Sequence, residues 1–248
     1  MKIGTWNVNG VRKRKDEVLR WLAEEQPDVA CLQEIKASAE NVPRELAEQP
    51  EYWSVWHGNK GYSGVALLLK KARFEEPPVV AHPAFDFEAR IVTATAGDRT
   101  FASTYVPNGG KDFAAKMQYL KAFEGWAREL ATQGASVVVC GDFNVARTPM
   151  DVHPTERGVK IGQLPEERLL LEGFLPHRLV DLVRHHHPED DRLYSWWAPW
   201  RNMREKNIGW RLDFVVADAG LAERAVACDV QKSFGTSDHA PVIARFED

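Results

Sequence analysis

The stretch Val137-Val138-Val139-Cys140-Gly141-Asp142-Phe143-Asn144 decides the fold, because it reads as a buried strand that ends in two polar side chains. Four consecutive apolar residues, three of them β-branched, are typical of a strand that is covered on both faces. Asp142 and Asn144 follow Gly141 at the carboxyl end, where open α/β sheets bind their ligands. Taken alone, Asp and Asn are also common turn formers, so this stretch leaves a simple strand end and a binding site as alternatives.

The overall composition is that of an ordinary globular protein. The chain has 248 residues, 44% hydrophobic and 27% charged, without a flexible linker, so we expect one catalytic domain over residues 1–248. No apolar run reaches the roughly 18 residues of a membrane span. Because Met1-Lys2-Ile3-Gly4-Thr5-Trp6 enters a strand-like pattern without a cleavable signal, we expect cytoplasmic residence. We also expect a monomer with no membrane partner. Cys31, Cys140 and Cys228 lie singly in apolar stretches, which predicts reduced core thiols.

The net charge argues against a protein whose whole surface is basic and binds nucleic acid. The formal net charge is −4, so any site for a polyanion must be local. Two basic concentrations exist, Arg12-Lys13-Arg14-Lys15 and the group Arg201, Arg204, Lys206 and Arg211. The first of them is as consistent with a solvated face as with a binding surface.

Apolar periodicity predicts two strand-rich halves with a similar plan. The expected strands span residues 3–8, 28–33, 52–57, 62–69, 90–95, 99–106, 137–140, 193–197, 211–217, 225–230 and 240–246. Helices are expected between the first two strands, over residues 113–130, and from Pro165 onward, with a long polar loop over residues 146–162. The natural packing of such elements is an α/β (α+β) sandwich of two mixed β-sheets flanked by helices.

Polar side chains collect at the predicted strand ends. They are Asn7, Glu34, Tyr105, Asn108, Asp142, Asn144, Asp213, Asp238 and His239. Asp213 lies in an apolar run and needs a partner if it is buried, for which His239 is the candidate. The set contains no nucleophilic serine or cysteine, and its hard oxygen donors suit Mg²⁺ or Mn²⁺. The chemistry most consistent with it is metal-assisted attack of water on a phosphodiester.

The run His185-His186-His187 is not expected to hold zinc, because three adjacent residues lack the facing geometry of such a site.

Seven short motifs in order resemble those of the exonuclease III family of apurinic/apyrimidinic (AP) endonucleases. They are Trp6-Asn7-Val8-Asn9-Gly10, Leu32-Gln33-Glu34-Ile35-Lys36, Tyr105-Val106-Pro107-Asn108, Gly141-Asp142-Phe143-Asn144-Val145, Pro165-Glu166-Glu167-Arg168, Gly209-Trp210-Arg211-Leu212-Asp213 and Ser237-Asp238-His239-Ala240-Pro241. The resemblance spans nearly the whole chain. It implies a four-layer, deoxyribonuclease-like sandwich of the endonuclease/exonuclease/phosphatase superfamily.

By position, the resemblance assigns roles to the motif residues. Glu34 would be the main ligand of Mg²⁺, or of Mn²⁺ in its place, with Asp238 contributing directly or through water and Asn7 completing this metal position. A second metal position would comprise Asp142, Asn144 and His239. Asp142 would activate the attacking water, or alternatively protonate the leaving group, while Asn144 steadies that water. Asn7, Tyr105 and Asn108 would hold the scissile phosphate, and His239, paired with Asp213, would bind a non-bridging oxygen. Some family members carry aspartate where this chain has Asn9, which changes the charge near the metal.

The same resemblance implies a DNA-binding surface. Trp196, Trp210 and Leu212 would line a slot for an extrahelical abasic deoxyribose, and Trp200 would be a wedge that enters the duplex. Further substrate contacts are expected from Asn9, Arg12, Asn108, Lys111, Arg201 and Lys206. Trp197 is as consistent with the core as with this surface.

The leading hypothesis is a DNA repair nuclease that hydrolyses the phosphodiester 5′ to abasic sites in duplex DNA. The resemblance also admits 3′-to-5′ exonuclease and 3′-end-cleaning activities, and an exonuclease-dominant member of the family is one alternative. Another alternative is a lipid or inositol phosphate phosphodiesterase of the same superfamily, and a third is a non-catalytic DNA-binding module.

Overall fold

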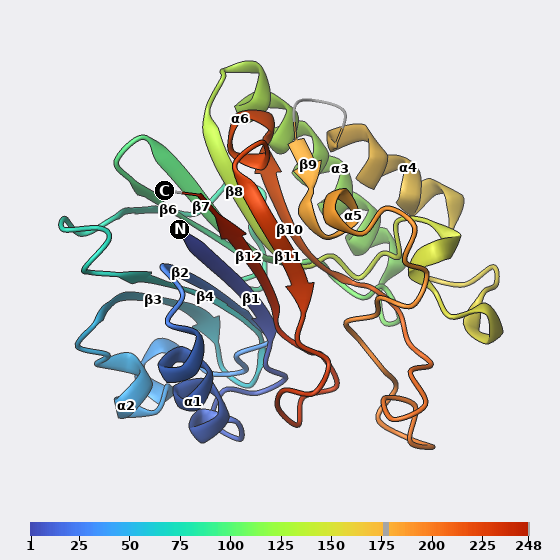
Figure 1. Cartoon of the computed structure of the whole chain (residues 1–248), viewed down its shortest axis with the longest axis horizontal. Coiled ribbons are helices and arrows are strands. Elements are labelled where there is room, and N and C mark those ends of the chain that lie inside the picture. The colour runs from blue at the N-terminus through green and yellow to red at the C-terminus, as the bar shows by residue number, and fades with distance from the viewer. Residues whose placement is uncertain (176–178, 248) are drawn as a thin grey trace.

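Two six-stranded sheets pack against each other in the computed structural model, which describes residues 1–175 and 179–247 (Figure 1). The first sheet contains β1 (Lys2–Asn7), β2 (Val29–Gln33), β3 (Tyr52–Asn59), β4 (Tyr62–Lys70), β11 (Ala225–Val230) and β12 (Val242–Phe246), in the order β11-β12-β1-β2-β4-β3. The second contains β5 (Val79–Ala81), β6 (Ile91–Ala96), β7 (Arg99–Tyr105), β8 (Ser136–Asp142), β9 (Leu179–Asp181) and β10 (Asp213–Asp218), in the order β5-β6-β7-β8-β10-β9.

Each sheet has one parallel strand pair among antiparallel neighbours. β1 and β2 are parallel and are connected through helix α1 (Lys15–Glu25), while β7 and β8 are parallel and are connected through helix α3 (Phe113–Thr132). A parallel pair requires such a crossover, whereas the antiparallel pairs β3/β4 and β6/β7 need only short turns. The predicted similarity between the two halves is therefore a repeated strand, helix, strand unit.

Helices cover the outer faces of both sheets. In Figure 1, α1 and α2 (Arg44–Ala47) lie on the first sheet, and α3 and α4 (Pro165–Phe174) lie on the far side of the second. Shorter helices are α5 (Leu182–His186), α6 (Ala219–Ala222) and the 3₁₀ turns η1 (Ala39–Asn41), η2 (Pro149–Asp151) and η3 (Pro154–Glu156). The order helix, sheet, sheet, helix confirms the predicted four-layer sandwich.

Strand β8 contributes to two of the three cores between these layers. Val138 and Cys140 belong to the cluster between the sheets, whereas Val137 and Val139 belong to the cluster under α3 and α4. Successive side chains of a strand point to opposite faces, so four apolar residues in a row satisfy both cores. The third core lies between the first sheet and α1, around Trp21.

Some predicted strand bounds are wrong. Residues 193–197 form no regular strand; Trp196 makes only isolated bridges to Trp210 and His239. β10 begins at Asp213 and β12 at Val242, two residues later than expected in each case. Apolar content misled the prediction in the first segment, because Tyr194 and Trp197 are buried against Ala240 as parts of a loop. Elements of three to five residues, such as β9 and α5, are too short to produce a periodic signal.

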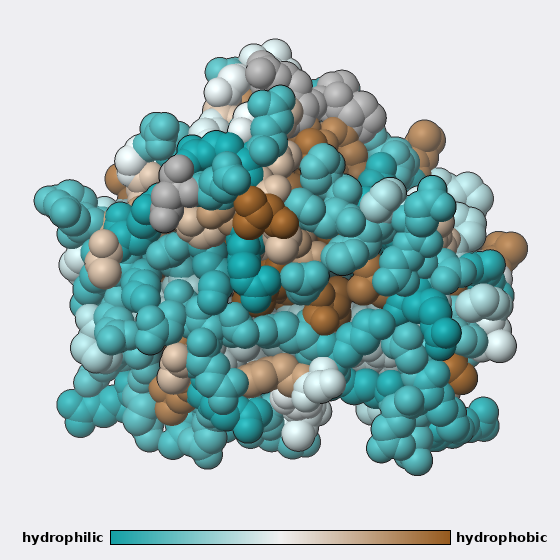
Figure 2. Space-filling model, in the orientation of Figure 1, coloured by the Kyte–Doolittle hydropathy of each residue, from teal (hydrophilic) through white to brown (hydrophobic). Residues whose placement is uncertain are grey.

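The three cysteines are free and buried, as predicted. Among the described residues no helix has the length and apolar content to span a membrane. The face of the molecule in Figure 2 is predominantly hydrophilic, with hydrophobic residues in small separate patches.

Candidate active site

Strand ends from both sheets meet at one end of the sandwich. Asp142 ends β8 and is in register with Tyr105 of β7 on one side and with Asp213 of β10 on the other. From the first sheet, Asn7 at the end of β1 donates its Nδ2 hydrogen bond to Oδ2 of Asp142 at 2.9 Å. A Cβ on Gly141 would lie 1.9 Å from the carbonyl oxygen of Thr104, so only glycine permits this approach of β7 and β8.

Glu34 follows β2 in a left-handed conformation, with φ of 49°. Its Oε1 accepts a hydrogen bond from Asn7 Nδ2 at 3.0 Å, and its Oε2 lies 2.7 Å from Nζ of Lys36. Burial raises the pKa of Glu34, but the hydrogen bonds from Lys36 and Asn7 outweigh it and hold the pKa below its ordinary value. Glu34 is therefore a carboxylate held at the site by two donors.

Asp142 is buried and accepts several hydrogen bonds. The backbone N–H of Asn144 donates to Oδ1 at 2.9 Å, and the side-chain amides of Asn7 and Asn144 donate to Oδ2 at 2.9 and 3.2 Å. Burial raises the pKa of Asp142 to about 7; Asp213 and Glu34 add to the rise, while His239 opposes it. A carboxyl group with this pKa is suited to accept or donate a proton near neutrality.

His239 is held by the predicted partner. Its Nδ1 lies 2.8 Å from Oδ2 of Asp213, and its Nε2 lies 3.7 Å from Oδ2 of Asp142. Burial alone would lower the pKa of His239, but the charges of Asp213, Asp142 and Asp238 outweigh it and raise the pKa to about 10. The imidazole is therefore protonated at neutral pH, which suits it to bind an anion.

Asp238 is fixed from two sides. Its Oδ1 accepts from Nδ2 of Asn9 at 2.7 Å and its Oδ2 from Nε1 of Trp196 at 3.1 Å. Nζ of Lys36 donates to Oδ1 of Asn9 at 2.6 Å. Asn9 thus connects Lys36 to Asp238 through both ends of its amide, which an aspartate could not do.

The donor set fits a divalent cation. One ligand atom from each of Glu34, Asp142 and His239 lies within 4.8 Å of the others, a group that draws on both predicted metal positions. Two carboxylates offer the oxygen ligands that Mg²⁺ and Mn²⁺ prefer. His239 would have to lose its proton to coordinate a metal, so the carboxylates are the stronger candidates.

A cavity of about 340 Å³ brings these groups together with the predicted slot. It is lined by Glu34, Tyr105, Asn108, Gly110, Asp142, Asn144, Ile161, Gly162, Trp196, Trp210, Leu212, Asp238 and His239. The rings of Trp196 and Trp210 meet edge to face at 5.7 Å and 79°. A Cβ on Gly209 would lie 2.4 Å from the carbonyl oxygen of Trp196, so glycine allows these segments to pair. The aromatic wall and the acidic groups share one cavity.

The predicted backbone contacts lie on the surface. Arg12, Asn108, Lys111, Trp200, Arg201 and Lys206 are all exposed, and Trp200 is 59% exposed. By contrast, Trp197 is buried in a core cluster.

Two arginines of the second basic group, Arg204 and Arg211, bind partners within the protein. Arg204 donates to the carbonyl oxygens of Lys232, Phe234 and Ser237. Arg211 is fully buried between the carboxylates of Asp151 and Asp181. Arg204 and Arg211 therefore do not add to a polyanion surface, because backbone oxygens and carboxylates already occupy their donors, and Arg201 and Lys206 are the exposed cations of this group.

A buried ion pair behind the site was not predicted. Nζ of Lys116 lies 2.6 Å from Oε1 of Glu167, and both side chains are 0% exposed. Lys116 also donates to the backbone oxygens of Asn144 and Asn108, at 2.8 and 3.3 Å. The available signal was its position on α3, four residues before Leu120 and seven before Phe123, which places it on the apolar stripe.

Comparison with known proteins gives consistent matches. The model of the endonuclease/exonuclease/phosphatase family matches residues 4–239. An exodeoxyribonuclease from Bacillus subtilis is 33% identical, with 98% of both chains covered. Among solved structures, an AP endonuclease from Archaeoglobus fulgidus is 30% identical, with a TM-score of 0.89. A 3′ phosphatase from Neisseria, bound to a product DNA hairpin, is 29% identical, with a TM-score of 0.90. Each alignment covers 100% of this chain and 100% of the other chain.

The family match spans most of the chain, the full-length relative exceeds 30% identity, and seven of the nine predicted strand-end residues, all except Asn7 and Asp213, line one cavity. The chain therefore belongs to the endonuclease/exonuclease/phosphatase family, within the group that contains exonuclease III-type exodeoxyribonucleases and AP endonucleases.

Proposed function

We propose that this protein is a DNA repair nuclease that hydrolyses the phosphodiester 5′ to abasic sites in duplex DNA, with Mg²⁺ as its metal ion and Mn²⁺ as a substitute. The observation that carries the proposal is the shared cavity, in which Glu34 and Asp142 face the same space as Trp196 and Trp210. A lesion without a base is the cheapest nucleotide to turn out of a duplex, and an aromatic slot of this size suits the bare sugar.

Asp142 is proposed to orient and deprotonate the attacking water. Its pKa of about 7 leaves a large fraction of the carboxylate free to take a proton at neutral pH. The Nδ2 of Asn144 donates to Oδ2 of Asp142 and to the carbonyl oxygen of Val106, which orients the amide, and its Oδ1 is proposed to hold the water. The same carboxyl group could instead protonate the leaving oxygen, and the two roles differ in which protonation state is active.

Asn7, Tyr105 and Asn108 are proposed to hold the scissile phosphate, and His239 is proposed to bind a non-bridging oxygen. The protonated His239 supplies a positive charge, Asn7 lies between Glu34 and Asp142, and Tyr105 supplies a phenol. Burial and the charges of Glu34 and Asp142 raise the pKa of Tyr105 well above its usual range, so the phenol keeps its proton as a donor. Donors aimed at the phosphate stabilise the charge that develops in the transition state.

Glu34 and Asp238 are proposed as the metal ligands, with Asn7 and the second group of Asp142, Asn144 and His239 close by. A bound Mg²⁺ would act there as a Lewis acid that stabilises negative charge on the phosphate. Lys36 and Asn9 orient the two carboxylates through the hydrogen bonds described above.

The DNA backbone is proposed to lie along the exposed cations Arg12, Lys111, Arg201 and Lys206, with Asn9 and Asn108 at the edge of the cavity and Trp200 as a wedge. Such a local surface is compatible with the net charge of −4, because affinity for DNA depends on the cations that contact its phosphates and not on the charge of the whole protein. The proposed enzyme acts as a monomer.

A second candidate is a 3′-end-processing or exonuclease-dominant enzyme of the same group. The full-length similarity to the Neisseria 3′ phosphatase favours it. Both candidates use the same acidic groups, and they differ in whether the cavity receives an internal sugar or a 3′ end.

The deciding experiment is incubation with three duplexes in Mg²⁺: one with a single internal tetrahydrofuran abasic analogue, one with a 3′-phosphate at a nick, and one undamaged. We expect incision 5′ to the analogue at a rate well above 3′-phosphate release. Faster release of the 3′-phosphate would establish the second candidate. Intact DNA in all three, together with turnover of an inositol phosphate, would overturn both and favour the lipid or inositol phosphodiesterase reading.

A further inference from the structure

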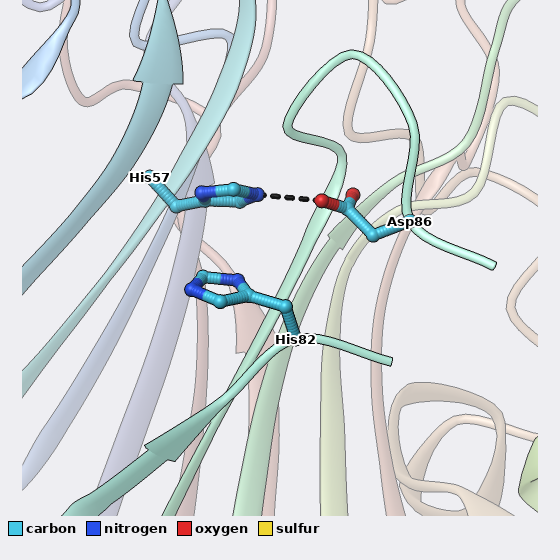
Figure 3. Close-up of side chains that lie close together, drawn as sticks. All are labelled: His57, His82 and Asp86. Atoms are coloured by element: carbon cyan, nitrogen blue, oxygen red, sulfur yellow. Dashed lines mark hydrogen bonds and ion pairs between the residues drawn. The ribbon is translucent and has the colours of Figure 1, made fainter. Parts of the chain in front are cut away.

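Two histidines and an aspartate meet at one edge of the sandwich, one from a strand of the first sheet and two from a loop of the second (Figure 3). His57 lies on β3, and His82 and Asp86 lie in the segment between β5 and β6. β3 and β5 are the outermost strands of their respective sheets. The cluster therefore bridges the two sheets where neither has a further strand to pair with.

The three side chains converge on a small volume. Nε2 of His57 lies 2.6 Å from Oδ2 of Asp86, and the rings of His57 and His82 lie 4.1 Å apart between centroids. One ligand atom from each residue lies within 4.8 Å of the other two. In Figure 3 the His57 ring extends toward the Asp86 carboxylate, and the His82 ring lies beside the His57 ring.

The Asp86 carboxylate is held in place by its other oxygen. Oδ1 accepts hydrogen bonds from the backbone N–H groups of Arg90 and Ile91, at 2.8 and 3.0 Å. Oδ2 is therefore the oxygen turned toward the histidines. A ligand that is already oriented by a second set of hydrogen bonds is the usual arrangement around protein metal ions.

We propose that His57, His82 and Asp86 form a second metal site, selective for Zn²⁺ or a similar transition ion. Two imidazole nitrogens and one carboxylate oxygen are a ligand set that Zn²⁺ accepts, with a water molecule at the fourth position. Imidazole ligands favour such ions over Mg²⁺, which prefers the oxygen donors of the active site. The two sites thus differ in the ion that they select.

The geometry requires only small changes. Ligand atoms on a tetrahedral Zn²⁺ are about 3.3 Å apart, so the contact between His57 and Asp86 would lengthen and the hydrogen-bonding proton would leave as the ion binds. His82 must move closer, and it is free to do so because its side chain is exposed. No covalent or redox step is involved.

The ion would connect the sheets at the end where the active site lies. His57 is in register with Val65, which is in register with Gln33, the residue before Glu34. On the other sheet, Asp86 holds the backbone of Arg90, whose Nη1 donates to the carbonyl oxygen of Tyr105 at 3.3 Å. The site is therefore a cross-link that supports both walls of the cavity, and its main effect is on stability.

The test measures Zn²⁺ binding to full-length, chelator-treated protein by titration calorimetry. A Glu34→Gln background weakens binding at the active site, and His82→Ala is added to it, because an exposed side chain can be removed without loss of folding. His185→Ala is the matched control, since it removes an exposed histidine from the run of three. Thermal unfolding with and without Zn²⁺ gives a second measurement.

We expect His82→Ala to remove one equivalent of Zn²⁺, or to weaken its binding by at least about tenfold, and to abolish the rise in Tm that Zn²⁺ causes. His57→Ala should do the same, and His185→Ala should change neither. Unchanged stoichiometry and affinity in His82→Ala would overturn the proposal and leave His57 and Asp86 as an ordinary hydrogen-bonded pair. Loss of binding in His185→Ala alone would assign the ion to the histidine run instead.

Discussion

Nδ1 of His239 lies 2.8 Å from Oδ2 of Asp213, and both side chains are buried. Oδ1 of Asp213 makes no hydrogen bond in the described structure, so the carboxylate serves His239 alone. The charge of Asp213 is the largest cause that raises the pKa of His239. Asp213 is thus a positioning residue, which fixes the orientation and the charge of the imidazole.

Asp213→Asn is expected to lower the pKa of His239 and to reduce turnover, because the amide keeps the shape but removes the charge. NMR titration of the His239 ring gives the pKa, and steady-state kinetics on abasic duplex give the rate. A merely structural role would leave the ring pKa unchanged and would reduce only stability.

Asp142→Asn and His239→Ala are each expected to lower kcat by at least about a hundredfold, since they remove a proton acceptor and a charge-stabilising group. Single-turnover cleavage of the abasic duplex measures the effect. Binding of the same duplex in Ca²⁺ is the control, because affinity should fall much less than rate. Near-parental rates in either variant would refute the role assigned to that residue.

Trp210→Ala is expected to reduce cleavage at the abasic analogue more than 3′-phosphate release, since Trp210 forms a wall of the slot but makes no hydrogen bond to the acidic groups. The ratio of kcat/KM on the two substrates is the measurement. Trp196→Ala is the comparison, because Trp196 also donates to Asp238 and its loss should slow both reactions. An unchanged ratio in Trp210→Ala would remove the slot from the mechanism.

Lys116→Met is expected to destabilise the protein by about 3–5 kcal/mol, since it leaves the carboxylate of Glu167 buried without its cation. Urea unfolding measures the change. The matched control is Lys160→Met, which breaks the exposed pair with Glu156 and should cost no more than about 1 kcal/mol. Similar losses of unfolding free energy in both variants would contradict the view that burial makes the Lys116–Glu167 pair costly to break.

Asp151 is expected to make stability depend on acid pH. Burial would raise the pKa of Asp151, but Arg211 and Arg184 outweigh it and hold the pKa far below its ordinary value. A depressed folded-state pKa adds stability that is present above the unfolded-state pKa of about 3.9 and is lost as the pH falls toward the folded value. Urea unfolding at pH 7, 4 and 3 should therefore show a smaller fall for Asp151→Asn than for the parent. Parallel pH profiles would contradict this assignment.

The sequence by itself predicted the layers of the fold and the residues of the candidate active site. The apolar run Val137 to Cys140 required two covered faces, and the structure has a core on each. The resemblance of the motif series named Glu34, Asp142 and His239, and one ligand atom from each of them lies within 4.8 Å of the others. Glu34 and Asp142 lie at the carboxyl ends of β2 and β8, whereas His239 precedes β12. The pairing of Asp213 with His239 followed from the cost of burying a charge without a partner.

Only the tertiary structure decided which charged side chains are paired inside the protein and which face solvent. Arg211 looks like Arg201 in sequence, yet it lies buried between Asp151 and Asp181, which are 60 and 30 residues away. His57 and Asp86 meet across two sheets in the same way. The physical reason is that periodicity reports only which face of its own element a side chain occupies, whereas the partner of a charge depends on packing between distant segments.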